Sequence, residues 1–175
     1  MLLRLGYETM RRRSELCAFK FEDIDRAPNG NPIIRLNFSK TDQFGTGKVL
    51  PMSEELLTLI EKWEGIVCNE GYILRSINKH DHIGISLNPA SISTILKTLQ
   101  EGLKTGSNQK PLSGHSFRVG AALDLLEKGE PLEKIMLRGG WQSDSTAMKY
   151  LRNWVFSLTY SVSKVRLSEL SSRNS

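Results

Sequence analysis

The sequence predicts an α+β fold that is mainly helical, with a small antiparallel β-sheet towards its N-terminal side. Apolar residues recur at helical spacing over most of the chain, whereas apolar and polar residues alternate in a short stretch near the start. With 175 residues, of which 39% are hydrophobic and 25% charged, the chain is long enough for one domain with an ordinary core. Helices that follow a short antiparallel sheet are typical of the α+β class.

The first element expected is a helix over residues 2–18, which contain strong helix formers and no proline. Two strands are expected next, over residues 19–25 and 33–38, because the Pro-Asn-Gly-Asn-Pro turn between them favours a hairpin. Residues 48–52, after a Gly-Thr-Gly turn, are a candidate third strand. Together these strands would form the sheet.

Helices are predicted over the rest of the chain, because capping residues precede stretches with helical apolar spacing. Their expected starts are Ser53, Asn88-Pro89, Ser113, Pro131, and Ser143 or Asp144. The second is expected to bury an apolar stripe that extends to Leu99 and Leu103. The third should stop at Gly129 and the fourth at Gly139-Gly140, since glycine commonly ends helices.

Charge, apolar runs and cysteine content indicate which kinds of partner and location this chain can have. The net charge of +5 comes from 24 basic and 19 acidic residues, and the excess gathers at the two ends of the chain. This distribution fits either a solvated face or a polyanionic partner. No apolar run reaches the roughly 20 residues of a membrane span, and the N-terminus does not read as a signal peptide. Two cysteines, Cys17 and Cys68, cannot staple a fold of this size, so a cytoplasmic location is expected.

Six side chains form a set suited to phosphoryl transfer, although each alone has an ordinary structural explanation. They are Arg12, Lys40, His115, Arg118, Trp141 and Tyr150. Arginine binds phosphate through two hydrogen bonds at once, and histidine and tryptophan N–H groups can donate to the remaining oxygens. A tyrosine hydroxyl can attack phosphorus, and a lysine can protonate a leaving alkoxide. No carboxylate pair with metal-ligand spacing and no Walker loop accompanies them, so neither a metal nor a nucleotide cofactor is expected.

In order, spacing and type, these residues resemble the tyrosine recombinases, also called the phage integrase family. The matching segments are Arg12-Arg-Ser-Glu15, Ser39-Lys40-Thr41, Ser113-Gly-His115-Ser-Phe-Arg118, Gly-Gly-Trp141 and Met148-Lys-Tyr150-Leu-Arg-Asn153. The resemblance implies the helical catalytic domain of a site-specific DNA recombinase, which cuts and rejoins strands without metal or ATP. The two arginines would hold the scissile phosphate, while the histidine and tryptophan complete its cradle. Tyr150 would form a 3′-phosphotyrosyl link, and Lys40 would protonate the departing 5′-oxygen.

Three residues near the first arginine have expected supporting roles. Glu15 either orients the phosphate cradle through hydrogen bonds or is an acid on the helix surface. Arg11 and Arg13 would lie on other faces of the expected helix, roughly 100° on either side of Arg12. They are therefore expected to bind DNA through charge rather than to take part in the chemistry.

The resemblance also gives expectations for organisation and partners. The family carries an N-terminal DNA-binding domain and further helices before its first arginine, whereas eleven residues precede Arg12. Residues 1–175 are therefore expected to be a single, N-terminally truncated catalytic domain. Residues 154–175 would form a tail that packs on its own domain or docks on a partner. Expected partners are double-stranded DNA with a specific recombination site and further copies of the chain, as a tetramer on that DNA. Neither a membrane nor a small-molecule substrate is expected.

Two other functions use the same residues. One is a type IB topoisomerase-like enzyme that nicks and closes DNA as a monomer. The other is a DNA-binding remnant of a recombinase that no longer catalyses the reaction. Assembly on DNA would separate the first from a recombinase, and the absence of a covalent protein–DNA adduct would identify the second.

Overall fold

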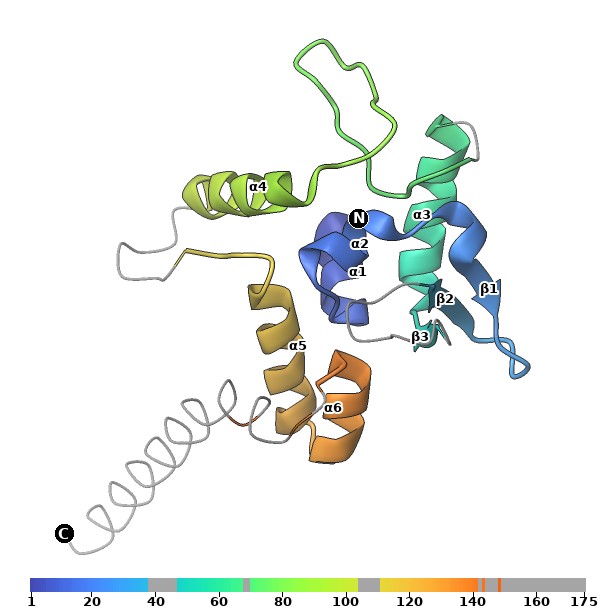
Figure 1. Ribbon diagram of the computed structural model, residues 1–175, viewed down its shortest axis with the longest axis vertical. Helices are drawn as coiled ribbons and strands as arrows, with labels where there is room; N and C mark the ends of the chain where they lie inside the picture. The colour runs from blue at the N-terminus through green and yellow to red at the C-terminus, as the bar shows by residue number, and fades with distance from the viewer. Residues whose placement is uncertain (38–46, 68–69, 104–110, 142, 144–147, 149–175) are drawn as a thin grey trace, which may run out of the picture. The chain divides into compact units, whose positions relative to one another are not determined.

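The computed structural model describes residues 1–37, 47–67, 70–103, 111–141, 143 and 148. The chain divides into two compact units, Met1–Ala121 and Ala122–Ser175 (Figure 1). Within the described ranges no helix combines the length and apolar character that a membrane span requires. The predicted α+β fold, mainly helical with a small antiparallel sheet, is confirmed.

The sheet has three strands, β1 (Ile24–Arg26), β2 (Pro32–Leu36) and β3 (Lys48–Pro51), in that spatial order and all antiparallel. Ile34 of β2 lies opposite Ile24 on one side and Leu50 on the other. Ile34, Leu36 and Leu50 are buried, while Arg35, which lies between Ile34 and Leu36 in β2 and opposite Val49, is exposed. Alternate burial of this kind is seen over Ile34–Leu36, whereas Pro32, Ile33 and Ile34 at the start of β2 are all buried.

The sheet packs with helices into the core of the first unit. The helical elements are α1 (Leu2–Thr9), α2 (Arg13–Ala18), the 3₁₀ turn η1 (Phe21–Asp23), α3 (Glu54–Val67), α4 (Pro89–Gly102) and the start of α5 (Ser116–Glu127). The predicted caps are confirmed at two of them. The Ser53 hydroxyl accepts the Leu56 N–H at 3.1 Å, and the Asn88 side chain accepts the Ala90 N–H at 2.9 Å.

The second unit contains the rest of α5 and α6 (Leu132–Gly139). Pro131 caps α6 and Gly140 follows it in the left-handed conformation, as the sequence predicted. Ile135 of α6 is buried. The predicted helix that carries Tyr150 and the tail over residues 154–175 lie outside the described residues.

The single helix predicted over residues 2–18 is wrong, because the chain forms two helices there. Met10 adopts a left-handed conformation with φ 54°, and its N–H ends α1 by donating to the Gly6 carbonyl at 3.1 Å. Arg12 is extended before α2 begins. A left-handed residue costs about 1–2 kcal/mol, and the Met10 side chain is fully buried, so packing outweighs local helix propensity here.

The strand predicted over residues 19–25 is mostly wrong, since only Ile24–Arg26 joins the sheet. Phe19 and Phe21 instead exchange backbone hydrogen bonds with Ile73 and Gly71, at 2.9 and 3.1 Å. The Asp23 carboxylate accepts the Lys20 N–H at 2.8 Å and closes the 3₁₀ turn. A side chain that bonds the backbone locally competes with strand pairing.

Two helix predictions need smaller corrections. Leu99 and Leu103 of the expected α4 stripe are 41% and 72% exposed, so the buried face of α4 ends near Leu96. Apolar periodicity marks a face, but the packing partner, α2, decides how much of it is buried. The third predicted helix starts at Ser116 rather than Ser113, because residues 113–116 form a hydrogen-bonded turn.

Candidate active site

The first part of the site is the junction between α1 and α2, where the Glu15 carboxylate bonds both the backbone and the side chain of Arg12. Glu15 accepts the Arg12 backbone N–H at 2.9 Å and an Arg12 guanidinium N–H at 3.1 Å. Glu15 is only 5% exposed, so it is not an acid on the helix surface. The Arg12 side chain is 38% exposed, which leaves its charge accessible to an anion in solution.

The second part is the turn that precedes α5. The Ser113 carbonyl accepts the Ser116 N–H at 2.8 Å, and the Ser116 hydroxyl accepts the Ser113 N–H at 2.9 Å. His115 extends from this turn, and its carbonyl accepts the Val119 N–H of α5. Gly114 is needed at this point, because a Cβ there would lie 2.1 Å from the Arg13 side chain. The turn therefore packs closely on α2 and presents His115 beside it.

Arg118 lies in the first turn of α5 and is only 3% exposed. Burying a guanidinium is costly unless its charge is compensated, so such a residue is unusual outside a functional or paired site. The pKa of His115 is lowered, first by partial desolvation and then by the positive charges of Arg118 and Arg12. Both arginines therefore act on the His115 imidazole, although Arg12 is about a hundred positions away from His115 and Arg118 in sequence.

A cavity of about 350 Å³ opens at this place. Its lining residues are Arg12, Arg13, Ser14, Pro89, Gly114 and His115. They come from the start of α2, the start of α4 and the turn before α5. Two of them are cationic side chains and a third is a histidine, so the cavity favours a negatively charged ligand.

The two arginines that flank Arg12 differ from each other in their surroundings. Arg13 is exposed, and its guanidinium donates to the Ser93 hydroxyl of α4 at 2.8 Å. Arg11 is 2% exposed and donates to the Thr9 carbonyl at 2.8 Å, and burial lowers its pKa. The expectation that Arg11 lies on another face of one continuous helix is wrong, because α1 ends before Met10 and Arg11 lies between α1 and α2.

Trp141 lies in the second unit, where two glycines determine its position. Gly140 has φ 66°, and the N–H groups of Gly140 and Trp141 donate back to the carbonyls of Leu137 and Met136. These two bonds form the Schellman pattern that ends α6. A Cβ at Gly139 would lie 2.4 Å from the Trp141 ring, so only glycine allows the indole to pack there. The ring is 8% exposed.

Lys40 and Tyr150 lie outside the described residues, so their roles remain predictions. Sequence reasoning missed Ser93, which is 80 positions from its partner Arg13 and has no distinguishing pattern. It also gave no separate role to Gly114, although a glycine directly before the candidate histidine was a usable signal for a close approach.

The chain is similar in sequence to a known protein family and to curated proteins. Residues 1–155 match the phage integrase family. The chain is 29% identical over 164 residues to the recombinase Cre of Escherichia phage P1, covering 86% of this chain and 48% of Cre. It is 24% identical over 149 residues to a tyrosine recombinase of Thermosipho africanus, covering 85% of this chain and 47% of that protein. The chain thus spans about half the length of these curated relatives.

A solved structure gives the same fold. The XerH site-specific recombinase, bound to a palindromic difH substrate, superposes with a TM-score of 0.68 at 17% identity. That match covers 93% of this chain and 44% of the XerH chain. At this level of identity the likeness concerns the fold alone.

Proposed function

This chain belongs to the phage integrase family, and from that premise we propose that it provides the catalytic domain of a site-specific DNA recombinase. The observation that carries the proposal is that Arg12 and His115 line one cavity, and that the positive charges of Arg118 and Arg12 both lower the pKa of the His115 imidazole. Two guanidinium groups and an imidazole suit a phosphodiester, whose transition state gathers negative charge on the non-bridging oxygens.

Arg12 and Arg118 would bind those oxygens and stabilise the charge that develops on them. Glu15 would keep the Arg12 guanidinium oriented, since it already holds both the backbone and the side chain of that residue. The lowered pKa leaves the His115 imidazole neutral at pH 7, so it would act as a hydrogen-bond donor rather than as a third cation. The Trp141 indole N–H would supply a further donor.

Tyr150 is proposed as the nucleophile. Its hydroxyl oxygen would bond to phosphorus and lose its proton to water, while the bond between phosphorus and the 5′-oxygen breaks. The electron pair goes to that oxygen, and Lys40 would protonate it. The resulting 3′-phosphotyrosyl ester can then be attacked by a 5′-hydroxyl, which reverses the same steps and rejoins the strand. Neither step uses a metal ion or ATP.

The partners we propose are double-stranded DNA with a specific recombination site and further copies of the chain, as a tetramer on that DNA. The net charge of +5 supports a polyanionic partner, and the XerH relative was solved on its DNA substrate. Arg13 would add a phosphate contact, since it is exposed beside the cavity. In the cell we propose a cytoplasmic location, with the nucleoid when DNA is bound.

The test is a covalent adduct on a pool of nicked suicide duplexes with randomised site sequence, detected on denaturing gels. The unsubstituted chain should form the adduct. Tyr150→Phe should abolish it and leave DNA affinity nearly unchanged, because only the nucleophilic oxygen is lost. Tyr160→Phe is the matched control and should retain the adduct.

Three outcomes would contradict the proposal. An adduct that survives Tyr150→Phe and disappears in Tyr160→Phe assigns the nucleophile to Tyr160. A folded chain that binds DNA without ever forming an adduct indicates a non-catalytic remnant. An adduct accompanied by relaxation of supercoiled DNA, with no assembly of paired sites, indicates a topoisomerase-like enzyme.

A further inference from the structure

The Arg13 side chain joins three parts of the first unit. Its guanidinium donates to the Ser93 hydroxyl of α4 at 2.8 Å. Its aliphatic stem faces the turn before α5, because a Cβ on Gly114 would collide with Arg13 Cγ and Cδ. Arg13 is itself the first residue of α2. One side chain therefore connects α2, α4 and the turn that carries His115, although these parts are far apart in sequence.

The turn over residues 113–116 holds its own shape. Besides the two bonds between Ser113 and Ser116, the His115 N–H donates to the Ser113 hydroxyl at 3.3 Å. The arginine stem occupies the place beside Gly114 where any other residue would have a Cβ. Because Gly114 and His115 are consecutive in this bonded turn, a support for Gly114 also places His115.

His115 lines the cavity of about 350 Å³ together with Arg13 and Gly114. Its pKa is lowered first by desolvation, and then by the charges of Arg118 on α5 and Arg12 beside α2. The residue of α4 that lines the cavity, Pro89, does not titrate. Removal of the Arg13 stem would enlarge this cavity beside the imidazole and admit more water to it.

We propose that Arg13 and Ser93 are positioning residues for His115. The stem of Arg13 supports the turn at Gly114, and the bond to Ser93 holds that stem in place. This inference rests on the proposed function, which makes His115 a hydrogen-bond donor to the scissile phosphate. It goes beyond the phosphate contact of the Arg13 charge, because a long cationic side chain packs with its stem and carries its charge at the tip.

Two variants of Arg13 separate its stem from its charge. Arg13→Met removes the charge and keeps an unbranched stem, whereas Arg13→Ala removes both. NMR titration of the His115 imidazole needs no activity, and His115→Gln distinguishes its signals from those of His80 and His82. In Arg13→Ala the pKa should rise towards 6.5, because water reaches the imidazole. In Arg13→Met it should stay close to that of the unsubstituted chain.

Cleavage of the suicide substrate at saturating DNA gives the second readout, since saturation removes differences in affinity. Arg13→Ala should lower the maximal rate about tenfold, because an error of about 1 Å in placement can cost up to 10²-fold. Arg13→Met should bind DNA more weakly and lose about threefold in maximal rate, as expected for one hydrogen bond. Ser93→Ala should lose the same threefold at normal affinity. Ser91→Ala, about 200° around α4 from Ser93, is the matched control and should be normal.

A Cβ at position 114 tests the contact itself. Gly114→Ala should lower the maximal rate and raise the pKa of His115, because the new methyl group collides with the stem and pushes the turn away. In the double variant Arg13→Ala with Gly114→Ala, the colliding Cγ and Cδ are absent. The new Cβ would then lie 3.5 Å from the Cβ of residue 13, which is an ordinary contact. The double variant should therefore be faster than Gly114→Ala alone.

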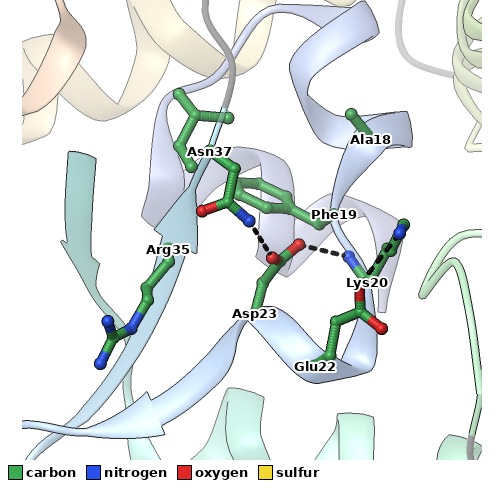
Figure 2. Close-up of a pocket in the computed structure, with 8 residues that line it drawn as sticks. Ala18, Phe19, Lys20, Glu22, Asp23, Arg35 and Asn37 are labelled. Carbon is green, nitrogen blue, oxygen red and sulfur yellow. Dashed lines mark hydrogen bonds and ion pairs between the residues drawn. The ribbon is translucent and has the colours of Figure 1, made fainter. Parts of the chain in front are cut away.

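The bond between Asn37 and Asp23 provides a control for the general effect of losing a hydrogen bond between elements. Figure 2 shows the Asn37 amide, which directly follows β2, donating to the Asp23 carboxylate of η1 beside a second cavity of about 100 Å³. This bond lies in the same unit as the turn but joins neither α4 nor the turn to α2. Asn37→Ala should therefore leave the pKa of His115 unchanged.

Several results would overturn the proposal. An equal rise of the His115 pKa in Arg13→Ala and Arg13→Met would assign the effect to charge, and an unchanged pKa in Arg13→Ala would show that the stem does not support the turn. A double variant no faster than Gly114→Ala would show that the two positions do not meet. If the unsubstituted chain forms no adduct, the proposed function fails, and the NMR comparison still decides whether Arg13 positions the imidazole.

Discussion

Arg12 and Trp141 both lie at the end of a helix, yet the chain fixes the two side chains by different means. Arg12 precedes α2, and a buried carboxylate holds it through two polar bonds. Trp141 follows α6, and two glycines set its position through a left-handed backbone and a close ring contact. The first region depends on charge and the second on shape, so substitutions should affect them in different ways.

The largest effect should come from removing the charge at Arg12. Arg12→Ala should slow adduct formation about 10²- to 10³-fold, comparable to the loss of one preorganised oxyanion donor. Arg12→Lys should restore little of that rate, because an ammonium group cannot bind two oxygens in parallel. Single-turnover cleavage of the suicide substrate measures both variants.

Glu15→Gln is the control that separates a role of Glu15 in orienting Arg12 from a role in the stability of the fold. It should reduce cleavage by the unsubstituted chain and have little effect in the Arg12→Ala background, because Glu15 acts through Arg12. Equal losses in both backgrounds would show that Glu15 only supports the fold. Normal cleavage by Arg12→Ala would remove Arg12 from the site altogether.

A smaller effect, on stability, is expected at the shape-dependent region. In Gly139→Ala the new Cβ would lie 2.4 Å from the buried Trp141 ring, so the ring must move. Overpacking of this kind typically costs about 1–3 kcal/mol in the free energy of unfolding, measurable by urea denaturation. Gly65→Ala in α3 is the matched control, since nothing lies within 4 Å of that position. It should be neutral or slightly stabilising, and equal destabilisation by both would contradict the steric explanation.

The smallest effect should be a pH dependence confined to the charge-dependent region. The pKa of His115 in the folded chain lies below its ordinary value of 6.5. As the pH falls through 6.5, the unfolded chain therefore binds the proton first, and the free energy of unfolding decreases until the folded pKa is passed. His115→Gln should remove this part of the slope between pH 7.5 and 5.5.

Trp141→Phe should leave that slope unchanged, because the indole does not titrate. Urea denaturation at a series of pH values makes the comparison. A slope that is the same in the unsubstituted chain and in His115→Gln would show that neither burial nor the charges of Arg118 and Arg12 lower the pKa of the imidazole.

Some parts of the fold could be predicted because their signals are local. Ser53 and Asn88 cap their helices through their own side chains, and Gly140 ends α6 through its own backbone conformation. The turn that joins β1 to β2 follows from its own Pro-Asn-Gly-Asn-Pro residues. Such features depend on a few consecutive residues, so the sequence contains all the information they need.

Other parts could not be predicted because distant residues decide them. The first helix ends at Met10, whose side chain is buried in the core. As a result, Arg11 is buried and Arg12 lies at the start of α2. Leu99 and Leu103 have the right spacing for burial, but the buried face of α4, which contacts α2, ends near Leu96. Propensity and periodicity do not include the partner surface.

The sequence by itself determined which residue types were available for phosphate chemistry, their order along the chain and the family to which the chain belongs. Only the tertiary structure decided that Arg12 and Arg118 both act on His115, that Glu15 is buried, and that Asp23 reaches Asn37. The physical reason is that some interactions depend on separation along the chain and others on separation in space. Caps and turns form between neighbours in sequence, whereas fields and buried hydrogen bonds depend on distances in space, which only the packed core sets.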